Sequence, residues 1–171
     1  MSVFKELNNI WRSTQYCINT KLKLYQSCVV STLLYGSECW RMTEVDLNKL
    51  RSFHTICLRR ILRVFWPEKI SNEDLLRSCR QEDMGTIITR RRWRWIGHVL
   101  RKDSQSIPRT ALHWTPCGRR KRGRPRTTWR RTVENEIKDM HSSWGSLARL
   151  AQDRQGWRDF VAAQHTSGCN G

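Results

Sequence analysis

Acidic residues are scarce in the middle of this chain of 171 residues. From residue 80 to residue 131 the acidic side chains are Glu82, Asp83 and Asp103, against sixteen Arg or Lys. Nowhere in the sequence are two Asp residues adjacent, and no Gly-rich phosphate-binding loop is present. Polymerases and nucleases need clustered carboxylates to hold divalent metal ions. We therefore expect no catalytic residue and no enzyme activity of the isolated chain. The pairs Glu73–Asp74 and Glu82–Asp83 lie beside expected helix starts, where a carboxylate usually caps the helix.

Paired cysteines are missing as well. The seven Cys include no C-x2-C pair, which most structural zinc sites contain. His54 and Cys57 are three residues apart, a spacing that suits the apolar face of a helix. His113 and Cys117 have the spacing of half a zinc site, without a second half. We therefore expect no metal ion and no cofactor.

Long apolar runs are also absent. The longest, from Cys28 to Tyr35, contains Ser31 and Thr32 and is far too short to span a bilayer. A basic amphipathic helix can lie on a membrane surface, but an extended and wholly polar basic segment further along argues against a membrane partner. The odd, scattered cysteines follow no secretory leader, so we expect a reduced intracellular protein, nuclear or cytoplasmic, and not a secreted one.

Helical periodicity is present almost throughout. Apolar residues recur every three or four positions, and no stretch alternates strongly enough for a sheet. Thr43 with Asp46 and Ser71 with Asp74 have the spacing of capping boxes, and Pro67 separates the two helices. Aliphatic residues are few for so charged a chain, although nine Trp add large apolar side chains. The sequence predicts an all-α fold of several amphipathic helices, loosely packed, with a flexible basic linker.

The strongest expected helix runs from about Met84 to Arg101. Two apolar rows lie side by side on it, one beginning at Ile88 and the other at Trp93. The opposite face carries a basic row at helical spacing, with Gly97 in its middle, which lets a backbone approach closely. The residues expected to contact phosphates on this helix are Arg90, Arg91, Arg94 and Arg101.

The stretch GRRKRGRPRTTWRRT (118–132) contains eight Arg or Lys and no acid. Its core, RGRPR, resembles the AT-hook peptide, in which Gly and Pro keep the chain narrow while Arg side chains enter an A·T-rich minor groove. The same stretch would also serve as a nuclear import signal, or as a solvated charge run in an Arg-rich linker. The candidate nucleic-acid-binding residues here are Arg119, Arg120, Lys121, Arg122, Gly123, Arg124, Pro125, Arg126, Arg130 and Arg131.

Four blocks together resemble the C-terminal part of reverse transcriptases encoded by non-LTR (LINE-like) retrotransposons. They are TKLKLYQSCVVSTLLYGSECW (20–40), CLRRILRVFWPEKISNEDL (57–75), RRRWRWIGHVLRK (91–102) and GRPRTTWRRTVENEIK (123–138). Their order and spacing match the stretch after the polymerase palm in that family. The segment AQDRQGWRDFVAA (151–163) resembles the family's closing segment.

The resemblance implies the function of the family's thumb and post-thumb region, without the catalytic domain of the polymerase. The palm's Tyr/Phe-x-Asp-Asp motif, the fingers and the endonuclease have no counterpart in this sequence, and neither does the Cys/His knuckle of some relatives. The implied function is to hold a primer–template duplex, element RNA or target DNA, alongside the rest of a reverse transcriptase. Two alternatives stay open: the tail of an RNA-directed DNA polymerase whose palm is supplied in trans, and a decayed retroelement relic with no selected function.

We also predict that the chain divides into five segments. They are a thumb-like helical segment (1–65), a helical extension with a basic stripe (66–114), a basic Gly/Pro linker (115–128), a C-terminal helical tail (128–163) and a disordered end (164–171).

Overall fold

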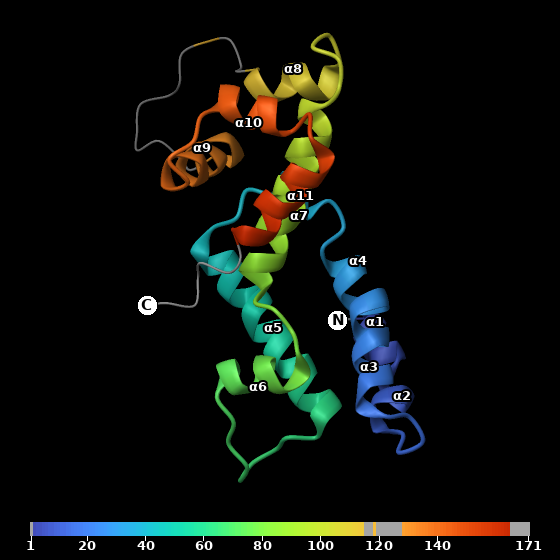
Figure 1. Cartoon of the computed structure of the whole chain (residues 1–171). Coiled ribbons are helices and arrows are strands. Elements are labelled where there is room, and N and C mark those ends of the chain that lie inside the picture. The colour runs from blue at the N-terminus through green and yellow to red at the C-terminus, as the bar shows by residue number, and fades with distance from the viewer. Residues whose placement is uncertain (1, 115–117, 119–127, 165–171) are drawn as a thin grey trace. The chain divides into compact units, whose positions relative to one another are not determined.

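The computed structural model describes residues 2–114, 118 and 128–164 (Figure 1). The predicted linker lies outside the described residues except at 118 and 128, and so does the predicted disordered end except at 164. The described residues form helices, turns and bends, with no strand among them, which confirms the all-α prediction.

The helices have these bounds: α1 Ser2–Glu6, α2 Asn8–Arg12, α3 Ile18–Leu24, the π-helix η1 Tyr25–Val30, α4 Ser31–Leu33, the 3-10 helix η2 Ser37–Cys39, α5 Glu44–Leu62, α6 Asn72–Cys79, α7 Met84–Leu100, α8 Ile107–His113, α9 Trp129–Asp139, α10 Trp144–Leu150 and α11 Arg154–Ala163.

The chain forms two compact units. Unit 1 comprises Met1–Ser37 with Glu44–Ile88, and unit 2 comprises Glu38–Thr43 with Thr89–Gly171. The boundary falls inside α7, so this helix supplies its first residues to unit 1 and the remainder to unit 2. The segments expected from the sequence are functional divisions and differ in kind from these compact units. They therefore stay a prediction.

In unit 1 the first two helices are short and are separated by one residue. Leu7, with φ −85° and ψ 11°, separates α1 from α2. The interruption brings Phe4 and Trp11 face to face, with ring centroids 5.2 Å apart, and the indole Nε1 of Trp11 donates to the carbonyl of Phe4 at 2.8 Å. The buried Lys21 donates to the carbonyls of Trp11 and Ser13 at 2.9 and 2.6 Å. These carbonyls lie at the end of α2, where no further helical turn provides donors.

The chain is helical from α3 to α4, and Gly36 follows this run with φ +68°, the left-handed conformation that suits a C-terminal glycine. The π-helical turn η1 within it was not expected. The cap of α6 is as predicted, because the Ser71 hydroxyl accepts from the Asp74 backbone N–H at 3.0 Å. Helix α5 ends at Leu62, before Pro67. Arg63, the residue after the helix, has a left-handed conformation with φ 59°.

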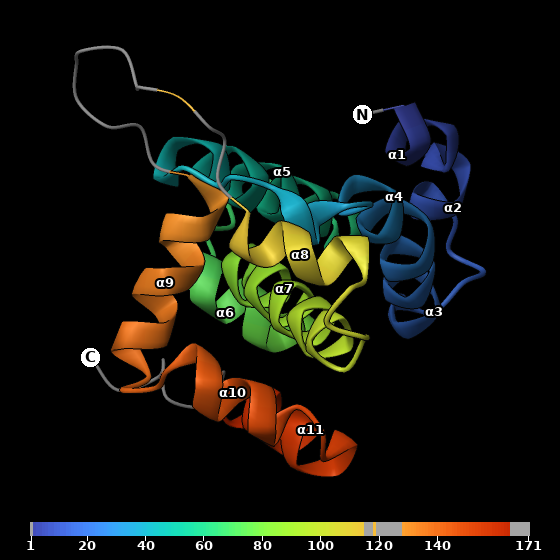
Figure 2. The ribbon, with the colours of Figure 1, turned by 90° about the horizontal axis from the view of Figure 1, so that it is seen from above.

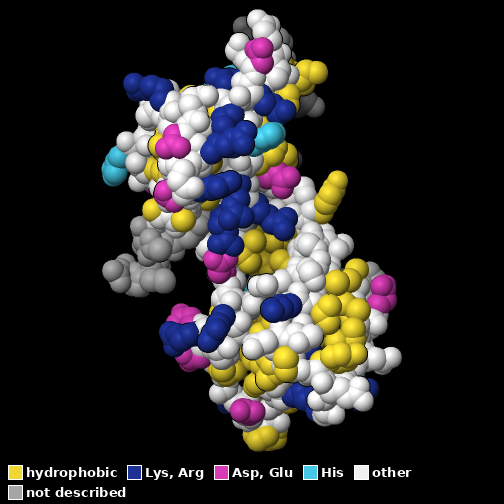
Figure 3. All heavy atoms as spheres, turned by 45° about the vertical axis from the view of Figure 1, so that its right-hand side comes forward, with side chains coloured by type: hydrophobic (Ala, Val, Ile, Leu, Met, Phe, Trp, Pro, Cys, Tyr) yellow, Lys and Arg dark blue, Asp and Glu magenta, His cyan; other side chains and the backbone are white. Residues whose placement is uncertain are grey.

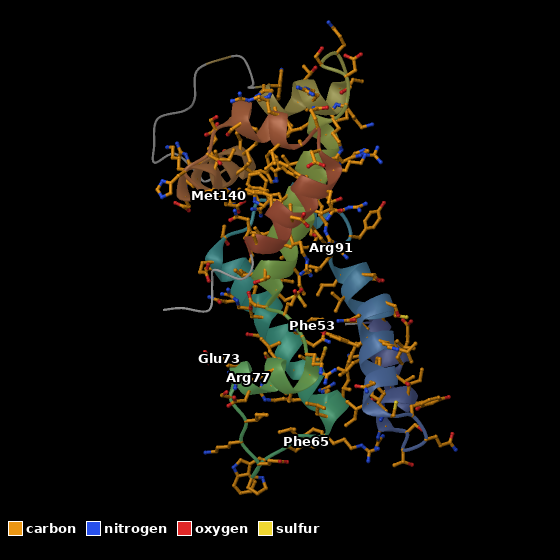
Figure 4. The ribbon with its side chains drawn as sticks, in the orientation of Figure 1. Phe53, Phe65, Glu73, Arg77, Arg91 and Met140 are labelled. Carbon is orange, nitrogen blue, oxygen red and sulfur yellow. The ribbon has the colours of Figure 1, made fainter. Side chains whose placement is uncertain are left out.

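Unit 2 is built around the C-terminal part of α7. Figure 2 shows α8, α9 and the α10–α11 run placed around it. The buried core takes side chains from each of these helices, including Trp93 and Ile96 of α7 and Trp157 of α11. On α9, Val133 and Ile137 are buried, while Trp129 and Met140 are partly buried against the core. Figure 4 labels Met140 beside the end of α9.

Candidate nucleic-acid interface

The basic face of α7 meets α11 at Gly97. A Cβ at this residue would lie 2.1 Å from Nε1 of Trp157, so the indole fills the space beside the glycine. The same Nε1 donates to the carbonyl of Trp93 at 3.1 Å. The close approach expected at Gly97 is therefore made by a helix of the same unit, whose Trp157 side chain fills the space beside the glycine.

This contact gathers arginines around it. Arg94 of α7 lies three residues before Gly97, and Arg101, in the turn that follows α7, lies four residues after it. On α11, Arg154 and Arg158 lie three residues before and one residue after Trp157. Arg154 and Arg158 are four residues apart and share one face of α11, and their charges act on Arg101. Arg94 is seven residues before Arg101, so helical spacing places it on the same side as Arg101. The α7–α11 arginine cluster consists of Arg94, Arg101, Arg154 and Arg158.

Arg101 is the anchored member of the cluster. It is half-buried, and its Nη1 donates to the carbonyl of Ala151 at 3.1 Å. Burial lowers the pKa of its guanidinium, and the positive charges of Arg154 and Arg158 lower it further. The charges of both helices therefore act on one another at this surface, which favours an anion beside them.

The other three members of the cluster are exposed, and among the described residues no carboxylate pairs with them. Two acids, the N-cap Asp153 and Asp159 within α11, are engaged along this helix. Asp153 accepts from the Gln155 backbone N–H, and Asp159 accepts from the Gln155 amide, each at 2.9 Å. Figure 3 shows Lys and Arg side chains gathered in a band over the elements of unit 2. The surface thus offers positive charge that no carboxylate in the described part of the chain neutralises.

The remaining predicted residues have different surroundings. Arg90 and Arg91 are half-buried on α7 (Arg91 is labelled in Figure 4). Arg130 is held by Glu134 and by the carbonyl of His113, each at 2.9 Å, whereas Arg131 is exposed at the start of α9. The predicted residues outside the described part of the chain are Arg119, Arg120, Lys121, Arg122, Gly123, Arg124, Pro125 and Arg126.

Arg92 has a structural role that the sequence reading missed. It is buried and forms an ion pair with Glu136 of α9, whose other oxygen accepts from Nε1 of Trp93 at 2.9 Å. Burial raises the pKa of the Glu136 carboxyl, although Arg92 and Trp93 both oppose that rise. A helical signal was present, because Arg92 lies four residues after Ile88 and four before Ile96, in the buried row.

The expected structural roles of His54 and Asp83 are confirmed. His54 is buried in unit 1 and its Nδ1 shares a hydrogen bond of 2.8 Å with the Tyr25 hydroxyl. Asp83 accepts from the Gly85 backbone N–H at 2.8 Å and from Arg51 Nε at 2.9 Å. Burial alone would raise the pKa of Asp83, but these hydrogen bonds outweigh burial and lower it. Within the described ranges, no group of three His, Cys, Asp or Glu residues is placed to hold a metal ion.

Comparison with known proteins points to a mobile element. The chain is 24% identical over 158 residues to the transposon-derived protein F52C9.6 of Caenorhabditis elegans. The match covers 86% of this chain and 56% of the relative, so the chain spans little more than half of that protein's length. No family model matches, and no solved structure matches. The chain has a transposon-related origin. In the described part, none of the helices is long and apolar enough to cross a membrane.

Proposed function

We propose that this chain is the nucleic-acid-binding C-terminal region, thumb and post-thumb, of a non-LTR retrotransposon reverse transcriptase. It holds the phosphate backbone of a primer–template duplex or of target DNA, and it is non-catalytic by itself. The observation that carries the proposal is the α7–α11 arginine cluster, in which two helices bring four guanidinium groups to one surface.

The chemistry of that surface favours a polyphosphate partner. Guanidinium groups bind phosphate oxygens in a geometry that a single Lys cannot reproduce. The formal net charge of +17 adds long-range attraction to any polyanion. The transposon-derived relative supports a mobile-element context, and the resemblance of the blocks at 20–40, 57–75, 91–102 and 123–138 supports the reverse transcriptase.

A salt titration tests the proposal. Four phosphate contacts would give a slope of about −4 for the logarithm of the association constant against the logarithm of salt concentration. Replacing Arg154→Gln together with Arg158→Gln should reduce the magnitude of that slope by about 2 and weaken binding to every duplex sequence alike. The measurement is fluorescence anisotropy of a labelled duplex DNA and of an RNA–DNA hybrid.

The control removes the same charge elsewhere. Arg77→Gln together with Arg80→Gln alters two exposed arginines at the end of α6 (Arg77 is labelled in Figure 4). This pair should leave the slope nearly unchanged. Equal losses in both double variants would mean that only net charge matters and would refute the cluster. A folded chain that binds neither duplex in a salt-sensitive way would favour the decayed relic.

A further inference from the structure

Unit 1 contains a hollow lined by aromatic and basic side chains. It has a volume of about 210 Å³, and its lining residues are Phe4, Asn8, Trp11, Arg12, Arg60 and Phe65. A volume below about 300 Å³ is smaller than the usual site of a drug-sized ligand. The hollow therefore suits one planar ring system and not a whole metabolite.

The floor and one side of the hollow are aromatic. Phe4 and Trp11 are 3% and 2% exposed and are stacked on each other, so their positions are fixed by the core of unit 1. Phe65 lies between α5 and α6 (Figure 4) and is 61% exposed. The exposed face of Phe65 is therefore open to stacking by a second ring.

The polar part of the lining consists of two positively charged arginines and one neutral amide, with no acid. Arg12 and Arg60 are exposed, and no carboxylate of the described chain pairs with either guanidinium. The carbonyl of Arg12 accepts a hydrogen bond from Arg63, which holds the end of α2 against the residue that follows α5. Asn8 adds an amide, which offers both a donor and an acceptor to the edge of a base.

We propose that this hollow binds one unpaired base of a single-stranded nucleic acid. The base stacks on Phe65, its edge meets the amide of Asn8, and the adjoining phosphates meet Arg12 and Arg60. Aromatic stacking beside a basic track is the usual means by which proteins bind single strands without sequence preference. The site goes beyond duplex binding by the α7–α11 arginine cluster, because its ligand is a base that a duplex keeps stacked.

The test uses the full chain and a short single strand carrying one 2-aminopurine, whose fluorescence falls when the base stacks on an aromatic ring. The wild-type chain should quench this fluorescence. Phe65→Ala should abolish the quenching and lower single-strand affinity about tenfold, whereas Phe65→Tyr should keep both. Circular dichroism checks that each variant is folded. We expect folding to be kept, because Phe65 is exposed and contributes little to the core.

Trp66 provides a matched control, because it is the adjacent aromatic residue, is 84% exposed and does not line the hollow. Trp66→Ala should leave quenching and affinity unchanged, and duplex affinity should be the same in all four proteins. Equal effects of Phe65→Ala and Trp66→Ala would overturn the site, and so would quenching that persists in Phe65→Ala. A chain that binds duplex with the expected salt slope but quenches nothing would refute this inference and leave the proposed duplex binding standing.

Discussion

The indole of Trp157 occupies the space that a side chain at residue 97 would need. Nε1 of Trp157 lies 2.1 Å from the position of a Cβ on Gly97, and it donates to the carbonyl of Trp93 at 3.1 Å. The close approach of α11 to α7 therefore depends on the missing side chain of Gly97. Because Arg154 and Arg158 lie on either side of this indole along α11, the placement of the arginine cluster depends on the same contact.

We expect Gly97→Ala to destabilise unit 2 by about 2 kcal/mol. Alanine is favoured over glycine inside a helix by up to about 1 kcal/mol, but overpacking a core costs about 1–3 kcal/mol and here displaces a buried Trp. The measurement is urea unfolding followed by circular dichroism. The variant should also bind duplex more weakly, because α11 shifts with its indole.

Gly145→Ala is the matched control for this prediction. A Cβ at Gly145 has only Ser143 Oγ nearby, at 3.9 Å, which is ordinary contact. This variant should be neutral or slightly more stable than the wild type. Equal stability of the Gly97→Ala variant and the wild type would contradict the close packing of Trp157.

The second prediction concerns the buried ion pair of Arg92 and Glu136. The side chain of Arg92 is 3% exposed and that of Glu136 is 22% exposed. Glu136→Gln leaves a buried guanidinium without its counter-charge and should cost about 3 kcal/mol of unfolding free energy. Replacing both partners, Arg92→Met with Glu136→Leu, should cost less than that single change, because no buried charge is left.

Glu134→Gln serves as the control on the same helix. Its partner, Arg130, is 2.9 Å away, but the two side chains are 33% and 41% exposed. Surface pairs of this kind contribute about 0–1 kcal/mol, so this variant should unfold almost as the wild type does. If Glu134→Gln and Glu136→Gln lowered the free energy of unfolding equally, the buried pair would contribute no more to stability than the surface pair.

The third prediction is a pH dependence of unit 1. Burial lowers the pKa of His54 from 6.5 to about 4, although the negative charge of Asp83 opposes this. The unfolded chain then binds a proton below about pH 6.5 that the folded chain refuses until about pH 4, so stability falls as pH falls through that window. Between pH 7.5 and 4.5 the loss should be about 2–3 kcal/mol.

Comparison with His54→Gln isolates this contribution. That variant should lose the pH-dependent part of the wild-type curve, whereas His98→Gln, at an exposed position on α7, should keep it. The pKa of Asp83 is lowered from 3.8, so its contribution is lost only below this window and does not obscure it. A wild-type chain of equal stability at pH 7.5 and 4.5 would contradict a buried neutral His54.

Local sequence was sufficient to predict most helices of this fold. Helices α5, α6 and α7 follow from apolar periodicity, and α6 follows also from its cap at Ser71, whose hydroxyl accepts from the Asp74 backbone N–H as expected. The π-helical turn η1 has no such signal, because its apolar spacing reads as ordinary α-helix. The burial of Arg92 could have been predicted, because its spacing from Ile88 and Ile96 places it in the buried row.

The arginine cluster could be predicted only in part. Arg94 and Arg101 stand out on α7 because the helix is strong and its basic row is regular. Arg154 and Arg158 are unremarkable in sequence, since a short polar helix usually has a solvated face. Their role appears only when Trp157 is known to pack on Gly97, and such a contact between residues far apart in the chain leaves no periodic signal.

The fourth prediction concerns the RGRPR core of the basic stretch. If Arg122 and Arg124 enter a minor groove, replacing both by Ala should weaken binding to an A·T-rich duplex more than to a G·C-rich one, because narrow A·T tracts concentrate negative potential. Anisotropy titrations at equal salt make this comparison. Equal losses on the two duplexes would mean phosphate contacts alone.

The fifth prediction is that the isolated chain does not synthesise DNA. Templated extension needs carboxylates that hold magnesium beside the primer end, and no Asp–Asp pair occurs in the sequence. A primer–template incubated with the chain, magnesium and nucleotides should therefore remain unextended, even when binding is saturated. A reverse transcriptase lacking its own thumb is the informative partner. Extension that appears only when both chains are present would replace the stand-alone binding role with that of a polymerase tail supplied in trans, whereas extension by this chain alone would refute the non-catalytic proposal.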